Sequence, residues 1–139
     1  MPETRAQSVE VSLRGKMTTV LLVDDDPMQA IVRKSVLERR FKHVVRAADA
    51  AEALGLMEKP HFANSINLVV TGLHLPGMRG PAFAAELHAR VPSVPILVLD
   101  TSGEPPAGPP NDSVRFLSTP LQPEDILAAA SQMLANASH

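Results

Sequence analysis

Three consecutive carboxylates are the residues in this chain best suited to chemistry. Asp24, Asp25 and Asp26 follow directly after the apolar run 20–23. Carboxylate oxygens bind hard cations such as Mg²⁺, and a carboxyl group can also take up or release a proton. Asp24 and Asp25 therefore form either a divalent-ion site or an acidic cluster without a ligand. Asp26 precedes Pro27, an order typical of a helix N-cap followed by the first helical residue.

Other site chemistries find little support in the sequence. The chain has no cysteine, which excludes disulfides, thiolate metal sites and cysteine nucleophiles. His74 is a lone histidine without a second ligand at metal-binding spacing. No glycine-rich nucleotide-binding pattern occurs. The sequence therefore predicts no cofactor and leaves Mg²⁺ at Asp24 and Asp25 as the one alternative.

The charge distribution indicates a protein partner. A formal net charge of -2 gives no strong field toward nucleic acids or acidic membranes. With four phenylalanines and no tyrosine or tryptophan, the chain also lacks an aromatic surface for stacking on bases. No apolar run reaches the ~20 residues of a membrane span, so we expect a cytoplasmic protein that binds neither nucleic acid nor membrane.

A cluster of basic residues lies in the first third of the chain. It forms a solvated face or, alternatively, a docking patch for an acidic protein. Its members are Arg33, Lys34, Arg39, Arg40, Lys42, His43 and Arg46.

The elements that position these residues alternate along the chain. Short apolar runs predict five strands, at 20–23, 44–45, 67–71, 96–99 and 114–117. Amphipathic stretches separate them, and this alternation is typical of a doubly wound α/β fold with a five-stranded parallel sheet. Residues 1–16 are polar and lack periodicity, so we expect a flexible N-terminal extension before a single domain at 17–139.

Four helices are expected between and after the strands. The first should follow Asp26 and three others should begin at Asp49, at residue 81 and at Pro123. Glu52 stands at capping-box spacing from Asp49. An apolar stripe at i, i+3, i+4 and i+8 predicts which face of the first helix packs on the sheet. The stripe consists of Met28, Ile31, Val32 and Val36.

The segment after the fourth strand breaks this alternation. Proline removes a backbone donor and clashes with the preceding turn, so four prolines within six residues exclude a stable helix. The fourth helix should therefore be missing or reduced, which would leave an apolar strip near Val98 and Phe116 for a partner to cover. The expected partner surface consists of Pro105, Pro106, Pro109 and Pro110, with Arg33, Arg39 and Arg40 on the first helix as the second choice.

Two motifs in this order resemble the receiver domains of bacterial response regulators. Residues 21–27, LLVDDDP, are similar to the acidic end of the family's first strand, and residues 73–80, LHLPGMRG, to the loop after its phosphoacceptor strand. Together with Thr119-Pro120-Leu121 before the last helix, the resemblance covers residues 18–134. It implies a CheY-like, flavodoxin-like fold and a role in two-component phosphorelay signalling.

The same resemblance implies that the phosphotransfer chemistry is lost. An active receiver holds three carboxylates around a magnesium ion, and one of them accepts the phosphoryl group. Gly72 occupies that acceptor position, so no phosphoacceptor remains. The family's switch positions are degenerate as well, with Asp100 in place of a hydroxyl, Thr119 in place of the lysine, and Phe116. A vestigial acidic pocket would consist of Asp24, Asp25 and Asp100.

The expected function is that of an atypical, stand-alone receiver without catalytic residues. It would act by phosphorylation-independent binding to a histidine kinase, another regulator or a second copy of itself. The alternative is a Mg²⁺-dependent phosphohydrolase that resembles haloacid dehalogenases, with Asp24 as nucleophile and Asp26 as acid. That alternative lacks the threonine and lysine partners that such enzymes place at neighbouring strand ends.

Overall fold

A five-stranded parallel sheet forms the centre of the protein. The computed structural model describes residues 18–72, 74–75, 77–100, 113–118 and 121–137. Its sheet strands are β1 (Thr19–Val23), β2 (His43–Ala47), β3 (Leu68–Gly72), β6 (Ile96–Asp100) and β7 (Val114–Ser118). They lie in the order β2-β1-β3-β6-β7, and all neighbours pair in parallel. The predicted five-stranded doubly wound sheet is confirmed.

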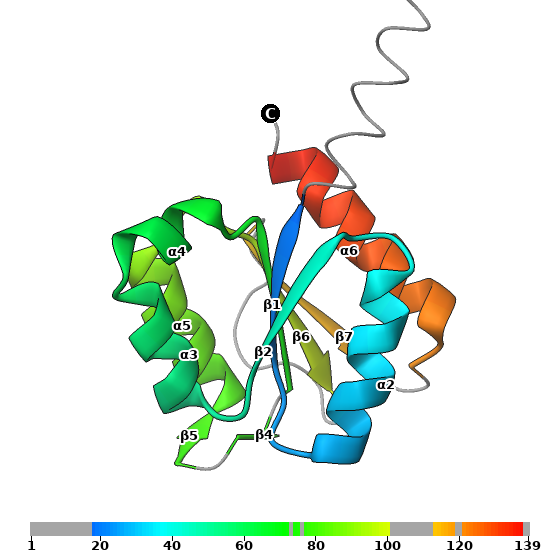
Figure 1. The fold of residues 1–139 in the computed structure, drawn as a ribbon, viewed down its shortest axis with the longest axis horizontal. Helices are drawn as coiled ribbons and strands as arrows, with labels where there is room; N and C mark the ends of the chain where they lie inside the picture. The colour runs from blue at the N-terminus through cyan, green and yellow to red at the C-terminus, as the bar shows by residue number, and fades with distance from the viewer. Residues whose placement is uncertain (1–17, 73, 76, 101–112, 119–120, 138–139) are drawn as a thin grey trace, which may run out of the picture.

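Helices cover both faces of this sheet (Figure 1). α2 (Pro27–Glu38) and α6 (Pro123–Ala137) lie on one side, and α3 (Ala50–Met57), α4 (Pro60–Ser65) and α5 (Gly80–Arg90) on the other. A short antiparallel hairpin of β4 (His74–Leu75) and β5 (Met78–Arg79) follows β3, and Gly77 in its turn has a φ of 78° that favours glycine. The sequence pattern predicts neither α4 nor this hairpin.

The sheet separates two apolar cores. In β1, Val20 and Leu22 pack with residues of α2 and α6, whereas Leu21 and Val23 pack with residues of α3 and α5. All four side chains are fully buried. A parallel strand covered on both sides has no solvent face, and for this reason its residues are apolar without alternation.

Helix α2 turns a different face to the sheet than its apolar stripe predicts. Met28, Ile31 and Val32 are 73%, 65% and 61% exposed, so the prediction of a buried stripe is wrong for three of its four members. The buried residues of α2 are Ala30, Arg33, Val36 and Leu37, so Val36 is the one member of the predicted stripe that is buried.

Two polar contacts fix this rotation of the helix. The side chain of Asp26 accepts the N–H groups of Met28 and Gln29 at 2.9 and 3.2 Å, which sets where the helix begins. Arg33 pairs with Asp24 at the end of β1, so its side chain has to face the sheet. Positions three before and four after Arg33 share its side of a helix, and these are Ala30 and Leu37.

The predicted caps are confirmed, and several predictions fall on parts of the chain that are not described. Asp26 caps α2 with Pro27 in its first turn, and Asp49 caps α3 by accepting the Glu52 N–H at 2.8 Å. The N-terminal extension 1–16, the switch residue Thr119 and the proline segment all lie outside the described residues. The described part of the chain contains no helix that is long and apolar enough to cross a membrane.

The orientation of α2 can be tested with two truncations on opposite faces of the helix. Leu37→Ala should lower the free energy of unfolding by about 2–5 kcal/mol, because Leu37 is fully buried. Ile31→Ala should change it by no more than about 0.5 kcal/mol, because Ile31 is exposed. Urea unfolding followed by circular dichroism measures both. The reverse order of the two losses would contradict the observed orientation.

Candidate functional site

Asp24 and Gly72 lie at the carboxyl ends of two neighbouring strands. Asp24 follows β1 and Gly72 ends β3, and the register pairs Val23 with Thr71 immediately before them. The order of the strands reverses between β1 and β3, since the chain builds β2 on one side of β1 and β3 on the other. Open α/β sheets place their sites outside the carboxyl ends of the strands at such a switch point.

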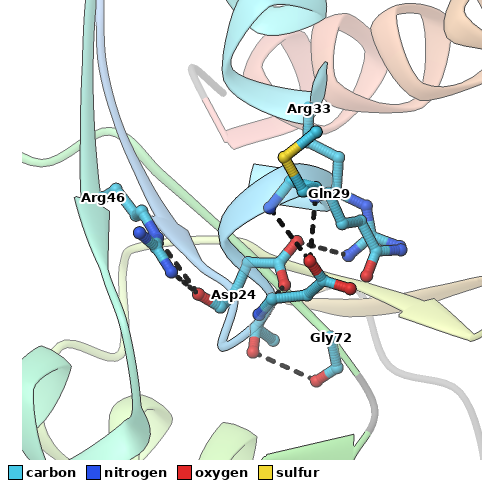
Figure 2. A network of polar contacts seen from close by, with 8 residues as sticks. Asp24, Gln29, Arg33, Arg46 and Gly72 are labelled. Atoms are coloured by element: carbon cyan, nitrogen blue, oxygen red, sulfur yellow. Dashed lines mark hydrogen bonds and ion pairs between the residues drawn. The ribbon is translucent and has the colours of Figure 1, made fainter. Parts of the chain in front are cut away.

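Asp24 is buried, and both its carboxylate and its main-chain carbonyl accept hydrogen bonds. Its Oδ1 accepts the Asp26 N–H at 3.0 Å, and its Oδ2 accepts from Nη1 of Arg33 at 3.1 Å. Its main-chain carbonyl accepts from Nε and Nη2 of Arg46 on β2, at 3.1 and 2.9 Å. Figure 2 shows Asp24 between the two arginines, with Arg33 reaching down from α2. Both carboxylate oxygens are therefore engaged by protein donors.

Arg33 is the cation of this site. Arg33 is 7% exposed, and arginine is rarely buried to this extent unless it forms an ion pair. Burial lowers the pKa of the Arg33 guanidinium, while the charge of Asp24, the hydrogen bond to it and the charge of Asp26 raise that pKa. Arginine stays protonated in proteins, so the pair with Asp24 places one positive charge against one negative charge inside the fold.

Gly72 leaves room beside this ion pair. Among the described residues, a Cβ atom at position 72 would have one neighbour within 4 Å, Nη1 of Arg33 at 4.0 Å, which is ordinary van der Waals contact. The φ angle of Gly72 is not in the left-handed region. Neither the backbone nor the packing of the described residues therefore requires glycine, and any side chain at this position would begin next to the guanidinium.

The three carboxylates of the predicted acidic pocket lie in different environments. Asp24 is buried against Arg33, whereas Asp25 is exposed. Asp100 is buried at the end of β6, where it pairs in register with Ser118. Asp26 is exposed and serves as the α2 cap.

The Mg²⁺ ion that the resemblance to receiver domains implies does not fit these residues. Within the described part of the chain, no group of three or more His, Cys, Asp or Glu side chains is placed to hold a metal ion. Gly72 offers no side-chain oxygen, and Oδ2 of Asp24 already contacts a cation. The two predicted ligands thus differ in their surroundings. Asp24 is buried and paired with Arg33, whereas Asp25 is exposed.

The basic cluster is divided between the site and the surface. Arg33 is buried, so its assignment to an exposed partner surface is wrong, and Arg46 is half-buried on the Asp24 carbonyl. Arg40 is exposed and donates to the Ser131 hydroxyl on α6 at 2.8 Å. Arg39 is exposed at the end of α2. Lys42 and His43 are exposed as well, whereas Lys34 is half-buried.

Of the predicted apolar strip, Val98 on β6 is fully buried, so the expected exposure is wrong for Val98, and Phe116 on β7 is half-buried. It pairs in register with Val98 on β6 and packs against the core on the side of α3 and α5. The proline segment that was expected to lie near it is not described, so a partner surface there stays a prediction.

The site residue missed by the sequence analysis is Arg33 in its role as partner of Asp24. A signal for it exists, because Ala30, Arg33 and Leu37 also recur at helical spacing and offer an alternative inner face of α2. That face contains a charge, and it becomes favourable only when a carboxylate is known to lie beneath it. The carboxylate comes from a residue nine positions earlier, at the end of a strand.

The two carboxylates of the phosphohydrolase alternative are both engaged by the protein. Asp24, the proposed nucleophile, accepts one hydrogen bond on each oxygen, from the Asp26 N–H and from Arg33. The proposed acid, Asp26, accepts two N–H groups of the helix that it caps. A cap of this kind stabilises the helix, and nothing in its contacts prepares the carboxyl group to donate a proton.

Comparison with known proteins identifies a related family. Residues 20–131 match the model of the response regulator receiver domain. A curated relative, the sensor kinase CckA of Brucella abortus (strain 2308), is 27% identical over 119 residues, which are 84% of this chain and 12% of that protein. The chain thus spans 12% of the length of the curated relative that it matches.

Solved structures agree in fold. The signal receiver domain of an HD domain-containing protein from Pseudomonas fluorescens Pf-5 has a TM-score of 0.74 at 26% identity and covers 88% of this chain and 98% of that one. A response regulator receiver domain protein from Clostridium thermocellum also has a TM-score of 0.74, at 20% identity, with 87% and 97% covered.

The coupling between Arg33 and Asp24 can be measured with a double-mutant cycle. Arg33→Met alone should destabilise the protein by about 3–5 kcal/mol, because it leaves the Asp24 carboxylate buried without a counter-charge. Adding Asp24→Asn should restore a large part of that loss, since no unpaired charge then remains. Urea unfolding at neutral pH gives the four free energies. Arg39→Met, on the exposed end of the same helix, is the control and should lie within about 0.5 kcal/mol of the wild type. Losses that simply add would contradict the coupling.

Proposed function

This chain belongs to the response regulator receiver domain family, and we propose that it works in two-component signalling by binding a protein partner without accepting a phosphoryl group. Receiver domains are signalling modules that interact with histidine kinases and other proteins. The partner is accordingly a histidine kinase, another regulator or a second copy of the chain, and a cytoplasmic location goes with this role.

Gly72 is the observation that carries the proposal. It ends β3 beside Asp24, at the position that the family motif gives to the phosphoacceptor aspartate. Phosphoryl transfer to a receiver forms an acyl phosphate on a side-chain carboxylate, and glycine has no such oxygen. The nearby carboxylate of Asp24 is paired with Arg33 through Oδ2, and its Oδ1 accepts the Asp26 N–H.

The outer face of α2 supports a role in binding. The exposed large apolar side chains among the described residues are Met28, Ile31 and Val32, all on this helix. Residues three and four apart share one helix face, so these side chains form a contiguous apolar patch next to the site. We call it the α2 patch. Exposed apolar groups that gather in one place are typical of an interaction surface.

Basic groups accompany the α2 patch. Arg39 follows the helix and is exposed, and Lys42 and His43 after it are exposed as well. The acidic residues Asp25, Asp26 and Glu38 on the same segment are exposed too. This combination favours a partner surface with an apolar centre and a rim that carries charges of both signs, because complementary charge directs docking. The partner surface that we propose on this helix therefore consists of the α2 patch and Arg39, and it does not include Arg33.

Phosphorylation can be tested directly. Incubation with acetyl phosphate and MgCl₂ should leave the intact mass of the wild type unchanged, because position 72 has no carboxylate. Gly72→Asp should take up little phosphoryl group, because its Cβ would lie 4.0 Å from Nη1 of Arg33 and its carboxylate would pair with that guanidinium. A receiver with an intact aspartate, treated in parallel, is the positive control. Stoichiometric acyl phosphate on the wild type would falsify the proposal.

The binding surface can be tested with matched charge insertions. Ile31→Asp should weaken binding of the partner by about tenfold or more, a loss typical of a central interface residue. Ala51→Asp, an exposed position of α3 on the opposite side of the sheet, should leave binding unchanged. Partners are first identified by co-purification with the tagged chain, and affinities of the purified two-component protein are then measured by titration calorimetry. Loss of binding in Ala51→Asp with full binding in Ile31→Asp would exclude the α2 patch.

A further inference from the structure

We propose that Arg33 is a built-in cation that takes the place of the divalent metal ion in this receiver. The inference deepens the proposed function, because it explains how the acidic strand end is neutralised when no ion and no phosphoryl group take part. It concerns the chain's own charge balance and can fail while the proposed function holds.

The position of the guanidinium supports this role. Nη1 of Arg33 lies 3.1 Å from Oδ2 of Asp24 and 4.0 Å from the place where a side chain at position 72 would begin. In the family, the metal ion neutralises the carboxylates of the first strand end together with the acceptor. One nitrogen of Arg33 therefore lies between two of the positions whose charge the ion would balance.

The charge count in the pocket also favours the exchange. With glycine at position 72, one of the three carboxylates of an active site is absent. At the end of β1 the buried carboxylate is Asp24, since Asp25 is exposed, and a second buried carboxylate, Asp100, lies at the end of β6. The guanidinium of Arg33 balances the charge of Asp24, and a divalent ion at the same place would add to a positive charge that is already present.

Exclusion of metal follows from the same contacts. A divalent ion bound to Oδ2 of Asp24 would lie near the fixed positive charge of Arg33, and two cations at such a separation repel each other strongly in a buried site. Arg33 is buried, and Ala30 and Leu37 on the same face of α2 are buried beside it. The guanidinium is therefore a fixed part of the folded structure.

The inference predicts that metal binding appears only when the built-in cation is removed and the missing carboxylate is restored. The wild type and Gly72→Asp should show no saturable rise in melting temperature with MgCl₂ or MnCl₂. Arg33→Met/Gly72→Asp should bind Mn²⁺ on the order of a hundredfold more tightly than Gly72→Asp, because one repelling charge is gone. The melting temperature of the double variant should rise with metal concentration, as expected for a ligand of the folded state.

Paramagnetic broadening in ¹H–¹⁵N spectra locates any bound Mn²⁺. In the double variant, the amide signals of residues 24–26 should broaden first, and in the wild type they should stay sharp. Arg33→Lys/Gly72→Asp is the matched control, since it keeps a positive charge and should bind metal no better than Gly72→Asp. If Arg33→Met does not fold, Arg33→Gln replaces it in the double variant.

Two results would overturn the inference. One is saturable Mn²⁺ binding by the wild type with selective broadening at residues 24–26, and the other is a folded double variant that gains no affinity for metal. Either result leaves the proposed function intact as long as the wild type takes no phosphoryl group from acetyl phosphate. Phosphorylation of the wild type would instead contradict the proposed function, so the two failures are distinct.

Discussion

The buried ion pair between Arg33 and Asp24 is the interaction on which this region of the molecule depends. Both residues are nearly inaccessible to solvent, and removing one partner of such a pair costs roughly 3–5 kcal/mol because the other charge is left in the interior. Asp24 is fixed further by the Asp26 N–H and by Arg46 from the neighbouring strand. The pair thus joins the end of β1 to α2, and Arg46 connects β2 to the same residue through the Asp24 carbonyl.

The Arg33–Asp24 ion pair determines which face of α2 is exposed to solvent. With Arg33 held over the end of β1, the inner face of the helix consists of Ala30, Arg33, Val36 and Leu37. The α2 patch then has to lie outside, although its residues are the more apolar set. The charge of one side chain therefore outweighs the burial of larger apolar groups, and the surface proposed for a partner is a consequence of the chemistry at the site. Site and surface are coupled through the rotation of a single helix.

The parts of the fold that the sequence predicts correctly are those set by local chemistry or by complete burial. The five strands are evident because parallel strands covered on both faces form continuous apolar runs. Asp26 and Asp49 are evident as caps because an N-cap acts on residues two and three positions away. The inner face of α2 is different, because spacing alone fits either side of the helix. The choice depends on a carboxylate from another element, and no window along the sequence contains that information. The two-residue strands of the β4–β5 hairpin are likewise too short to produce a pattern.

Two glycines in neighbouring segments differ in whether their backbone conformation favours glycine. Gly77 has a positive φ in the turn between β4 and β5, so its backbone explains the residue. Gly72 has no such φ, and among the described residues a Cβ there would meet only ordinary contact with Arg33. Within the described structure, neither the backbone nor the packing therefore requires glycine at the end of β3. What the fold still has to neutralise is the charge of Asp24, which lies buried at the adjacent strand end whether or not an acceptor is present. A residue on α2 that supplies a fixed positive charge meets this requirement from within the chain, and Arg33 pairs with Asp24 in this way at 3.1 Å. The proposed replacement of the metal ion by Arg33 rests on this contact.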